Sequence, residues 1–109
     1  MIYTLNAPML DFLVLTVIEQ GDAYGYQISQ ILKKVSNAKD STLYPVLKRL
    51  QENGWVEAYD RPFQGRNRRY YHMTETGQQH QRELLEEWKW FREAIEEIVS
   101  GGNSDGEQG

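Results

Sequence analysis

The sequence predicts a mostly α-helical fold with a small β wing: a winged helix-turn-helix in the order α-α-α-β-β-α, with a long C-terminal helix. Three observations predict it. Helical patterns in the first half of the chain each end at a glycine or a polar connector. Two runs of strand formers then flank a basic, glycine-containing turn, and a final helical pattern repeats apolar residues in heptads. Three helices followed by a hairpin is the order of a winged helix-turn-helix.

Length and composition suit one small globular domain. The chain has 109 residues, of which 39% are hydrophobic and 26% are charged. No run reaches the ~18 apolar residues that a membrane span requires, and no secretion signal is recognisable. Because there is no cysteine, disulfides, a thiol nucleophile and a Cys-based zinc site are excluded. We therefore expect a cytoplasmic protein that does not bind membranes.

The net charge of −4 hides two basic islands. Residues 33–49 carry five Lys or Arg and one Asp, and residues 60–73 carry four Arg and one Asp. Residues 74–109 hold nine acids and three bases. A chain with basic islands in an acidic background can bind an anion locally. Two solvated loops would give the same distribution, so charge alone leaves both interpretations open.

The first expected helix runs from an N-cap at Asn6 to about Glu19, with Pro8 in the first turn, where proline is tolerated. Its apolar residues cover almost the whole circumference. A helix of this kind in a small protein must be buried on more than one side, which is a first indication of a partner chain.

The second expected helix runs from about Tyr24 to Val35, with apolar residues at helical spacing. Gly25 near its start is unusual inside a helix. It indicates close approach of a neighbouring backbone or a ligand.

The third expected helix covers residues 41–53 and carries Pro45 near its start. If Thr42 caps the helix, Pro45 lies where a backbone N–H has no helical partner. If Ser41 or Asp40 caps it, the proline costs a hydrogen bond. The sequence leaves both alternatives open.

The wing is expected as a two-stranded hairpin with strands over residues 55–59 and 68–73 and a turn region over residues 60–67. Thr74 then caps a helix that runs to about Val99, and the Gly-rich tail 100–109 is expected to be disordered. The expected divisions are residues 1–73 for the winged helix-turn-helix, 74–99 for the last helix and 100–109 for the tail.

The third helix and the wing are the expected DNA-binding elements. In a helix-turn-helix, the N-terminal part of the third helix faces base edges and phosphates. Hydroxyl groups and backbone N–H groups at a helix start attract phosphate, and arginines in a wing can enter the minor groove or follow phosphates. The candidate contacts are Tyr24, Lys39, Ser41, Thr42, Tyr44, Pro45, Lys48, Arg49, Gly65, Arg66, Arg68 and Arg69.

Each of these features has a plainer interpretation. A Lys-Arg pair is common on any surface helix, and a basic hairpin protects an exposed sheet edge from aggregation. Strand alternation also places Arg68 and Arg69 on opposite faces, so that only one of them is optimally aimed. A winged-helix module that binds a protein and no DNA is therefore the alternative, and the acidic remainder of the chain favours it.

The last helix carries a short heptad seam whose apolar residues are spaced 4, 3, 4 and 3 apart. Such a helix can pack on its own core in a monomer. Together with the all-round apolar first helix, it favours a homodimer held by the two terminal helices. The expected interface residues are Met9, Leu13, Leu84, Trp88, Phe91, Ile95 and Ile98.

No pattern in the sequence supports catalysis. There is no zinc-protease motif, no Gly-rich phosphate loop and no convincing pair of carboxylates. His72 and His80 have no partner motif, and we interpret them as a wing-strand residue and a solvated residue. We expect no enzyme activity, no metal and no cofactor.

An ordered set of short pieces resembles the PadR-like family of transcriptional regulators over roughly residues 8–99. The short length is similar to the subfamily that includes a lactococcal multidrug-binding repressor. The resemblance implies a homodimeric repressor that binds an inverted-repeat operator through its third helices and wings. The matching pieces are Gly25-Tyr26, Thr42-Leu43-Tyr44-Pro45, Leu47-Lys48-Arg49-Leu50, Asn53-Gly54, Gly65-Arg66, Arg69-Tyr70-Tyr71, Thr74-Glu75 and Gly77.

The resemblance also implies a pore at the dimer centre, where a planar aromatic ligand stacks between paired Trp88 side chains and weakens operator binding. Without the resemblance, a tryptophan at a helix seam is most often plain packing. The sequence departs from the multidrug pattern at Arg92, where that regulator has an acid, and bulky leucines narrow the pore. The residues that the resemblance places near the pore are Phe12, Leu15, Gln81, Leu84, Leu85, Trp88 and Arg92.

Overall fold

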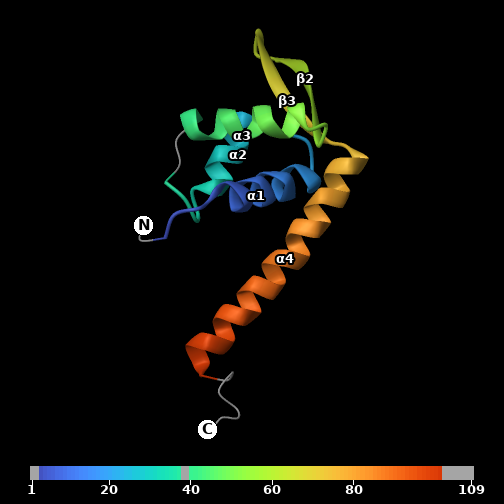
Figure 1. Cartoon of the computed structure of the whole chain (residues 1–109). Helices are drawn as coiled ribbons and strands as arrows, with labels where there is room; N and C mark the ends of the chain where they lie inside the picture. The colour runs from blue at the N-terminus through green and yellow to red at the C-terminus, as the bar shows by residue number, and fades with distance from the viewer. Residues whose placement is uncertain (1–2, 38–39, 102–109) are drawn as a thin grey trace.

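The computed structural model, which describes residues 3–37 and 40–101, shows a helical body, a β-hairpin above it and a long helix that extends away from both (Figure 1). The principal extents are 67 × 31 × 20 Å. The predicted winged helix-turn-helix with a long C-terminal helix is confirmed. The elements are α1 (Ala7–Glu19), β1 (Ala23–Tyr24), α2 (Gly25–Leu32), α3 (Asp40–Glu52), β2 (Val56–Phe63), β3 (Arg66–Met73) and α4 (Glu75–Ser100).

The core lies where α1, α2, α3 and the base of the sheet meet. Leu15, Ile28, Leu47, Leu50 and Val56 are fully enclosed there. Burying one such side chain stabilises the fold by about 1.5–3 kcal/mol relative to leaving it exposed. The same core therefore fixes α3 and the base of the wing relative to each other.

The apolar circumference of α1 is covered from two sides within the chain. One side packs in the core through Val14, Leu15 and Ile18. On another side, the ring of Phe12 contacts the ring of Trp88 on α4, with centroids 5.8 Å apart. Part of the burial that the sequence assigned to a partner chain is thus supplied by α4.

The predicted caps at Asn6 and Thr74 are confirmed. The Asn6 side chain accepts a hydrogen bond of 3.0 Å from the N–H of Met9, and a proline follows in the first turn. The Thr74 hydroxyl accepts a hydrogen bond of 3.0 Å from the N–H of Gly77. Each bond satisfies a backbone donor that has no helical partner.

The start of α4 is locked to the junction between α3 and β2. Gly77 is buried, and a Cβ at this position would overlap the carbonyl oxygen of Trp55. The Thr74 hydroxyl donates to the carbonyl oxygen of Gly54 over 2.6 Å, and the ring of His80 stacks on Trp55 at 3.8 Å. These contacts fix the direction in which α4 leaves the body. His80, expected to be solvated, is instead part of this joint.

The sheet has three strands and not the two that were predicted. β1 pairs antiparallel with β3 through Ala23↔Tyr71 and Tyr24↔Tyr70, so the strand order is β1-β3-β2. A strand of two residues is too short to show an alternating pattern, which explains why the sequence did not predict it.

The wing strands are longer than predicted. They extend through the expected turn region, and only Gln64 and Gly65 connect them. Both residues have positive φ, 51° and 78°, as the favoured two-residue hairpin turns require. Pro62 hid the strand in the sequence, but β2 is an edge strand, where proline is tolerated.

The helix bounds differ slightly from the predictions. α2 ends at Leu32, and the next three residues form turns. α4 runs one residue further than predicted, to Ser100, and Gly101 caps it in the left-handed conformation. The candidate contact Lys39 and the tail from residue 102 onward lie outside the described residues.

Candidate nucleic-acid interface

One face of α3 is buried and the other is exposed. Leu43, Val46, Leu47 and Leu50 lie in the core and hold the helix on the body. The opposite face carries hydroxyl, aromatic and cationic groups, and the Tyr44 side chain is 70% exposed. The predicted contacts exposed on α3 are Ser41, Thr42, Tyr44, Pro45 and Lys48.

Pro45 lies inside α3, because the helix begins at Asp40. Asp40, Ser41 and Thr42 all lie within the helix, so both alternatives for its cap are wrong. Proline has no N–H, so the carbonyl oxygen of Ser41 receives no helical hydrogen bond from residue 45. The proline therefore costs α3 one helical hydrogen bond in its exposed first half.

A groove separates the exposed face of α3 from β3. Arg69 points into it from the sheet and is 60% exposed, with its Nε 3.6 Å from the carboxylate of Asp60. Burial raises the pKa of the Tyr71 phenol at the floor, and the nearby Arg69 partly opposes this shift. The groove brings together cationic, hydroxyl and aromatic groups from two elements. Its lining residues are Ser41, Tyr44, Pro45, Lys48, Gln51, Glu52, Arg69 and Tyr71.

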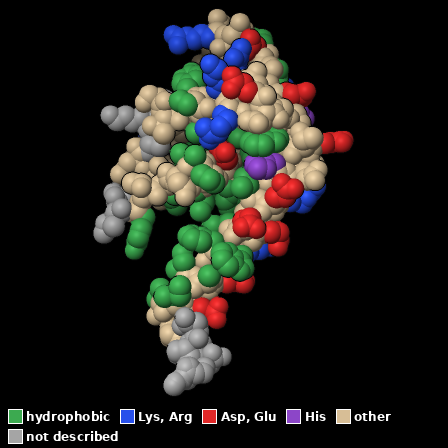
Figure 2. Space-filling model, viewed as in Figure 1, with side chains coloured by type: hydrophobic (Ala, Val, Ile, Leu, Met, Phe, Trp, Pro, Cys, Tyr) green, Lys and Arg blue, Asp and Glu red, His purple; other side chains and the backbone are tan. Residues whose placement is uncertain are grey.

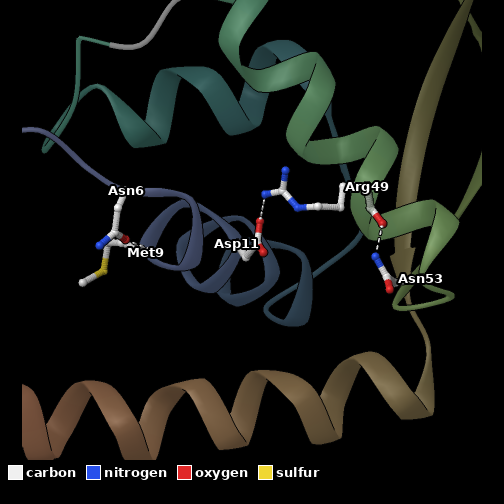
Figure 3. A network of polar contacts seen from close by, with 5 residues as sticks. All are labelled: Asn6, Met9, Asp11, Arg49 and Asn53. Atoms are coloured by element: carbon white, nitrogen blue, oxygen red, sulfur yellow. Dashed lines mark hydrogen bonds and ion pairs between the residues drawn. The ribbon is translucent and has the colours of Figure 1, made fainter.

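Arg49 points away from this groove. Its guanidinium forms an ion pair with Asp11 on α1, and its backbone carbonyl accepts a 2.8 Å hydrogen bond from the Asn53 side chain (Figure 3). The Asp11 side chain is only 13% exposed. The structure therefore separates the adjacent cations of α3: Lys48 lies in the groove, whereas Arg49 ties α3 to α1.

Arg68 and Arg61 lie on the outer face of the wing, against aromatic rings. The guanidinium carbon of Arg68 is 4.0 Å from the ring centre of Tyr24 and 3.6 Å from that of Phe63. Arg61 lies over Tyr59 and Tyr70, at 5.7 and 5.3 Å. Cation–π contacts of this kind hold an arginine in place and stiffen a hairpin. The predicted division of Arg68 and Arg69 between two faces agrees with this arrangement.

The wing tip carries Gly65 and Arg66, both exposed. Arg66 pairs with Phe63 in the strand register, directly after the two-residue turn. A narrow, exposed tip with a cation at its base has the shape needed to approach a groove of duplex DNA.

A smaller hollow of about 260 Å³ lies beside the groove, at the start of α2. Tyr24, the N-cap residue of α2, lines it and contacts Arg68. Gly25 also lies here, but a Cβ at this position would meet no atom within 4 Å, so the predicted close approach of a neighbouring backbone is wrong. The lining residues are Tyr24, Gly25, Tyr26, Leu43, Tyr44, Leu47, Arg68, Arg69 and Tyr71.

A separate hollow of about 240 Å³ lies between the start of α1 and the middle of α4. Trp88 is central to it: Phe12 contacts its ring, and the Arg92 guanidinium lies 4.9 Å from its ring centre. Glu87 adds a carboxylate to the lining. The lining residues are Asn6, Pro8, Met9, Phe12, Leu84, Glu87, Trp88 and Phe91.

The remaining residues expected near a pore do not line this hollow. Leu15 is fully buried in the core. Gln81 is also buried, and its amide donates to the hydroxyl of Thr16 over 3.1 Å. Leu85 is half-buried on α4. The structure thus brings together Phe12, Leu84 and Trp88 at the hollow.

The far half of α4 exposes an apolar seam. Phe91, Ile95 and Ile98 are 51%, 42% and 67% exposed. Figure 2 shows apolar side chains gathered over this part of the molecule. Met9 and Leu13 on α1 are half-buried. The predicted interface residues therefore lie on the side of the molecule away from the wing.

Several residues that shape the site were missed by the sequence analysis: Asp11, Asp22, Tyr59, Arg61 and His72. Strand alternation contained a partial signal, because a two-residue turn at Gln64-Gly65 places Tyr59 opposite Tyr70. For Asp11 and Asp22 the sequence contained no such signal, because their partners lie far away in the sequence.

Within residues 3–37 and 40–101, no group of His, Asp and Glu side chains is arranged to hold a metal ion. The same residues contain no helix long and apolar enough to cross a membrane.

Comparison with known proteins gives consistent matches. A model of the transcriptional regulator PadR-like family matches residues 14–83. The crystal structure of smu.1704 from Streptococcus mutans is 40% identical, covers 93% of this chain and 95% of its own, and superposes with a TM-score of 0.88. An uncharacterized protein of Lysinibacillus sphaericus is 36% identical over 97 residues, which are 84% of this chain and 89% of that protein. Bacillus subtilis PadR in complex with operator DNA is 26% identical, covers 70% of this chain and 46% of its own, and has a TM-score of 0.65.

Proposed function

Since the chain belongs to the PadR-like family of transcriptional regulators, we propose that it binds operator DNA through two surfaces. They are the exposed face of α3 and the inner face of the wing, which is the face that carries Arg69 and Tyr71. One observation carries the proposal: the groove brings Tyr44 and Lys48 of α3 and Arg69 of β3 to a single exposed surface. The B. subtilis relative, which was crystallised with operator DNA, supports it.

In this proposal, α3 enters the major groove, which is wide enough for a helix. Ser41, Tyr44 and Pro45 present hydroxyl, aromatic and apolar groups toward base edges and sugars, while Lys48 and Arg69 neutralise phosphates. Arg66 at the wing tip reaches the adjacent minor groove. Arg49 and Arg68, which are held by Asp11 and by two aromatic rings, act mainly as supports.

The regulator acts as a homodimer in this proposal, with the seam of α4 covered by a second copy. Exposed Phe91, Ile95 and Ile98 are the observation that supports it. Apolar residues in heptads favour pairing of helices. A two-fold symmetric dimer presents two copies of α3, so the matching operator is an inverted repeat, and occupation of a promoter by the dimer represses transcription.

A planar aromatic ligand at Trp88 is a further part of the proposal, and the hollow between α1 and α4 supports it. Phe12 contacts the indole of Trp88 and Arg92 lies over its ring, so such a ligand has to displace the Arg92 guanidinium in order to stack. Ligand entry would then shift α4 relative to α1 and alter the spacing of the two wings.

A winged-helix module that binds a protein and no DNA is the second candidate. The acidic surface of α4 and the net charge of −4 favour it. It differs from the first candidate in a simple respect, because a protein-binding module gives no salt-dependent binding to duplex DNA.

The test is fluorescence anisotropy with a duplex from the gene's own upstream region, titrated with salt and then with planar aromatic compounds. We expect affinity to fall steeply as salt rises, because phosphate contacts release counterions. Tyr44→Ala and Arg69→Ala should each weaken binding by about 1–3 kcal/mol, while Arg82→Ala on the exposed surface of α4 serves as the control. Binding that is insensitive to salt and to both substitutions would contradict the proposal, and no binding at low salt would favour the protein-binding module.

A further inference from the structure

Asp22, in the turn that follows α1, connects the body to both strands of the wing. Its Oδ2 accepts a 2.6 Å hydrogen bond from the hydroxyl of Tyr59 on β2. Its Oδ1 lies 2.8 Å from Nδ1 of His72 on β3. The hydrogen bonds from these two side chains lower the pKa of the Asp22 carboxyl, which is therefore ionised at neutral pH. An ionised carboxylate only accepts hydrogen bonds, so Nδ1 of His72 is the donor.

Tyr59 links Asp22 to a series of ring contacts on the outer face of the hairpin. Its ring stacks on Tyr70 with centroids 5.6 Å apart and planes inclined by 15°. Tyr70 in turn meets Tyr24 edge to face at 5.4 Å, and Arg61 lies over both Tyr59 and Tyr70. The bonded Tyr59 hydroxyl therefore orients a series of rings and cations that continues toward the wing tip.

The distal part of the hairpin has few other attachments to the body among the described residues. Val56, Tyr71 and Met73 anchor its base in the core, whereas every residue from Asp60 to Asn67 is exposed. A hairpin that is anchored only at its base can rotate about that base unless contacts hold both of its faces. The inner face meets α3 around Tyr71, and Asp22 braces the outer face.

We propose that Asp22 is a positioning residue for DNA binding: through Tyr59 and His72 it sets the angle of the wing over α3. The inference rests on the proposed function, because the angle determines where Arg69 and Arg66 lie relative to the exposed face of α3.

The first test is operator binding by Asp22→Asn, Tyr59→Phe and His72→Gln. Each is expected to weaken binding about 3-fold to 10-fold, as for loss of one partly exposed charge-assisted hydrogen bond, with the slope of log Kd against log salt unchanged. Tyr59→Phe keeps the ring stack and removes only the hydroxyl. Glu57→Gln, which removes a carboxylate on the same face and leaves the Asp22 contacts in place, is the matched control and should leave operator affinity unchanged.

The second test needs no DNA. The chain has no cysteine, so Asn67→Cys on the wing and Gln30→Cys on α2 can carry two spin labels on exposed positions. Diluting labelled with unlabelled protein suppresses distances between subunits. We expect one narrow distance distribution in the otherwise native chain and a broader one with Asp22→Asn or Tyr59→Phe.

The two tests separate the failures. If the chain does not bind DNA but the distances broaden, the proposed function fails and Asp22 still braces the wing. If the distances and the operator affinity are both unchanged by Tyr59→Phe and Asp22→Asn, the positioning role is overturned. A salt slope that drops with Asp22→Asn would also overturn it, because a positioning residue removes no phosphate contact.

Discussion

The two ends of the molecule treat their side chains differently. At α3 and the wing, cations are matched within the chain: Arg49 pairs with Asp11, and Arg68 lies between two aromatic rings. In the far half of α4, Phe91 and Ile98 remain half exposed or more. The end formed by α3 and the wing therefore has a polar groove whose neighbouring cations already have partners. The end formed by the far half of α4 has an apolar seam that one chain does not cover. The comparison teaches that ionic and cation–π contacts within the chain support the proposed DNA-binding surface, whereas the exposed seam is the basis of the proposed dimer.

The largest expected effect comes from placing a charge in the seam. Ile95→Asp should weaken dimerisation at least about 100-fold, because a two-fold symmetric interface would bury two unpaired carboxylates. Analytical ultracentrifugation over a range of concentrations measures it. Trp90→Asp is the matched control, since residue 90 lies about 120° around α4 from the seam. If both variants dissociate equally, or neither does, the seam is not the interface.

The next effect concerns the joint between the two ends. Gly77→Ala should lower the free energy of unfolding by about 1–3 kcal/mol, because a Cβ there would overlap the Trp55 carbonyl and force α4 to move. Urea denaturation measures the change. Gln78→Ala, at an exposed neighbouring position, should stay within about 0.5 kcal/mol of the wild type. A Gly77→Ala protein as stable as the wild type would mean that α4 is not locked at this joint.

A smaller effect distinguishes the adjacent cations Lys48 and Arg49 on α3. Arg49→Ala should lower the free energy of unfolding by about 1–2 kcal/mol, since it leaves the largely buried Asp11 without its ion pair, while the partial exposure of Arg49 limits the loss. Lys48→Ala should have little effect on stability. A double-mutant cycle with Asp11→Asn isolates the pair, and a coupling energy near zero would contradict the assignment.

The sequence predicted the parts of this molecule that depend on local chemistry. Asn6 and Thr74 were identified as caps because capping acts over three residues, and α3 and α4 followed from helical periodicity. Contacts between residues far apart in the chain could not be predicted from the sequence. Asp11 and Arg49 are 38 residues apart, and Asp22 and His72 are 50 apart, so no local pattern connects them. β1 was missed for a related reason, because its only signal is its pairing with β3.

The candidate site was predicted residue by residue with mixed precision. Local reasoning named Tyr44, Lys48 and Arg69 among the candidate contacts, and the groove of the structure brings them together. It could not distinguish Lys48 from Arg49, because neighbouring helical positions differ by about 100° and only the packing of α3 on α1 decides which one faces the core side. The folded arrangement of the whole body settles that choice.

The most direct test of the central claim compares Lys48→Ala with Arg49→Ala in a salt titration of operator binding. If the groove between α3 and the wing binds the DNA backbone, Lys48→Ala should reduce the slope of log Kd against log salt by about 1. Arg49→Ala should leave the slope unchanged, because its guanidinium is paired with Asp11 on the other side of α3. An unchanged slope for Lys48→Ala, or a reduced slope for Arg49→Ala, would contradict this account of the binding surface.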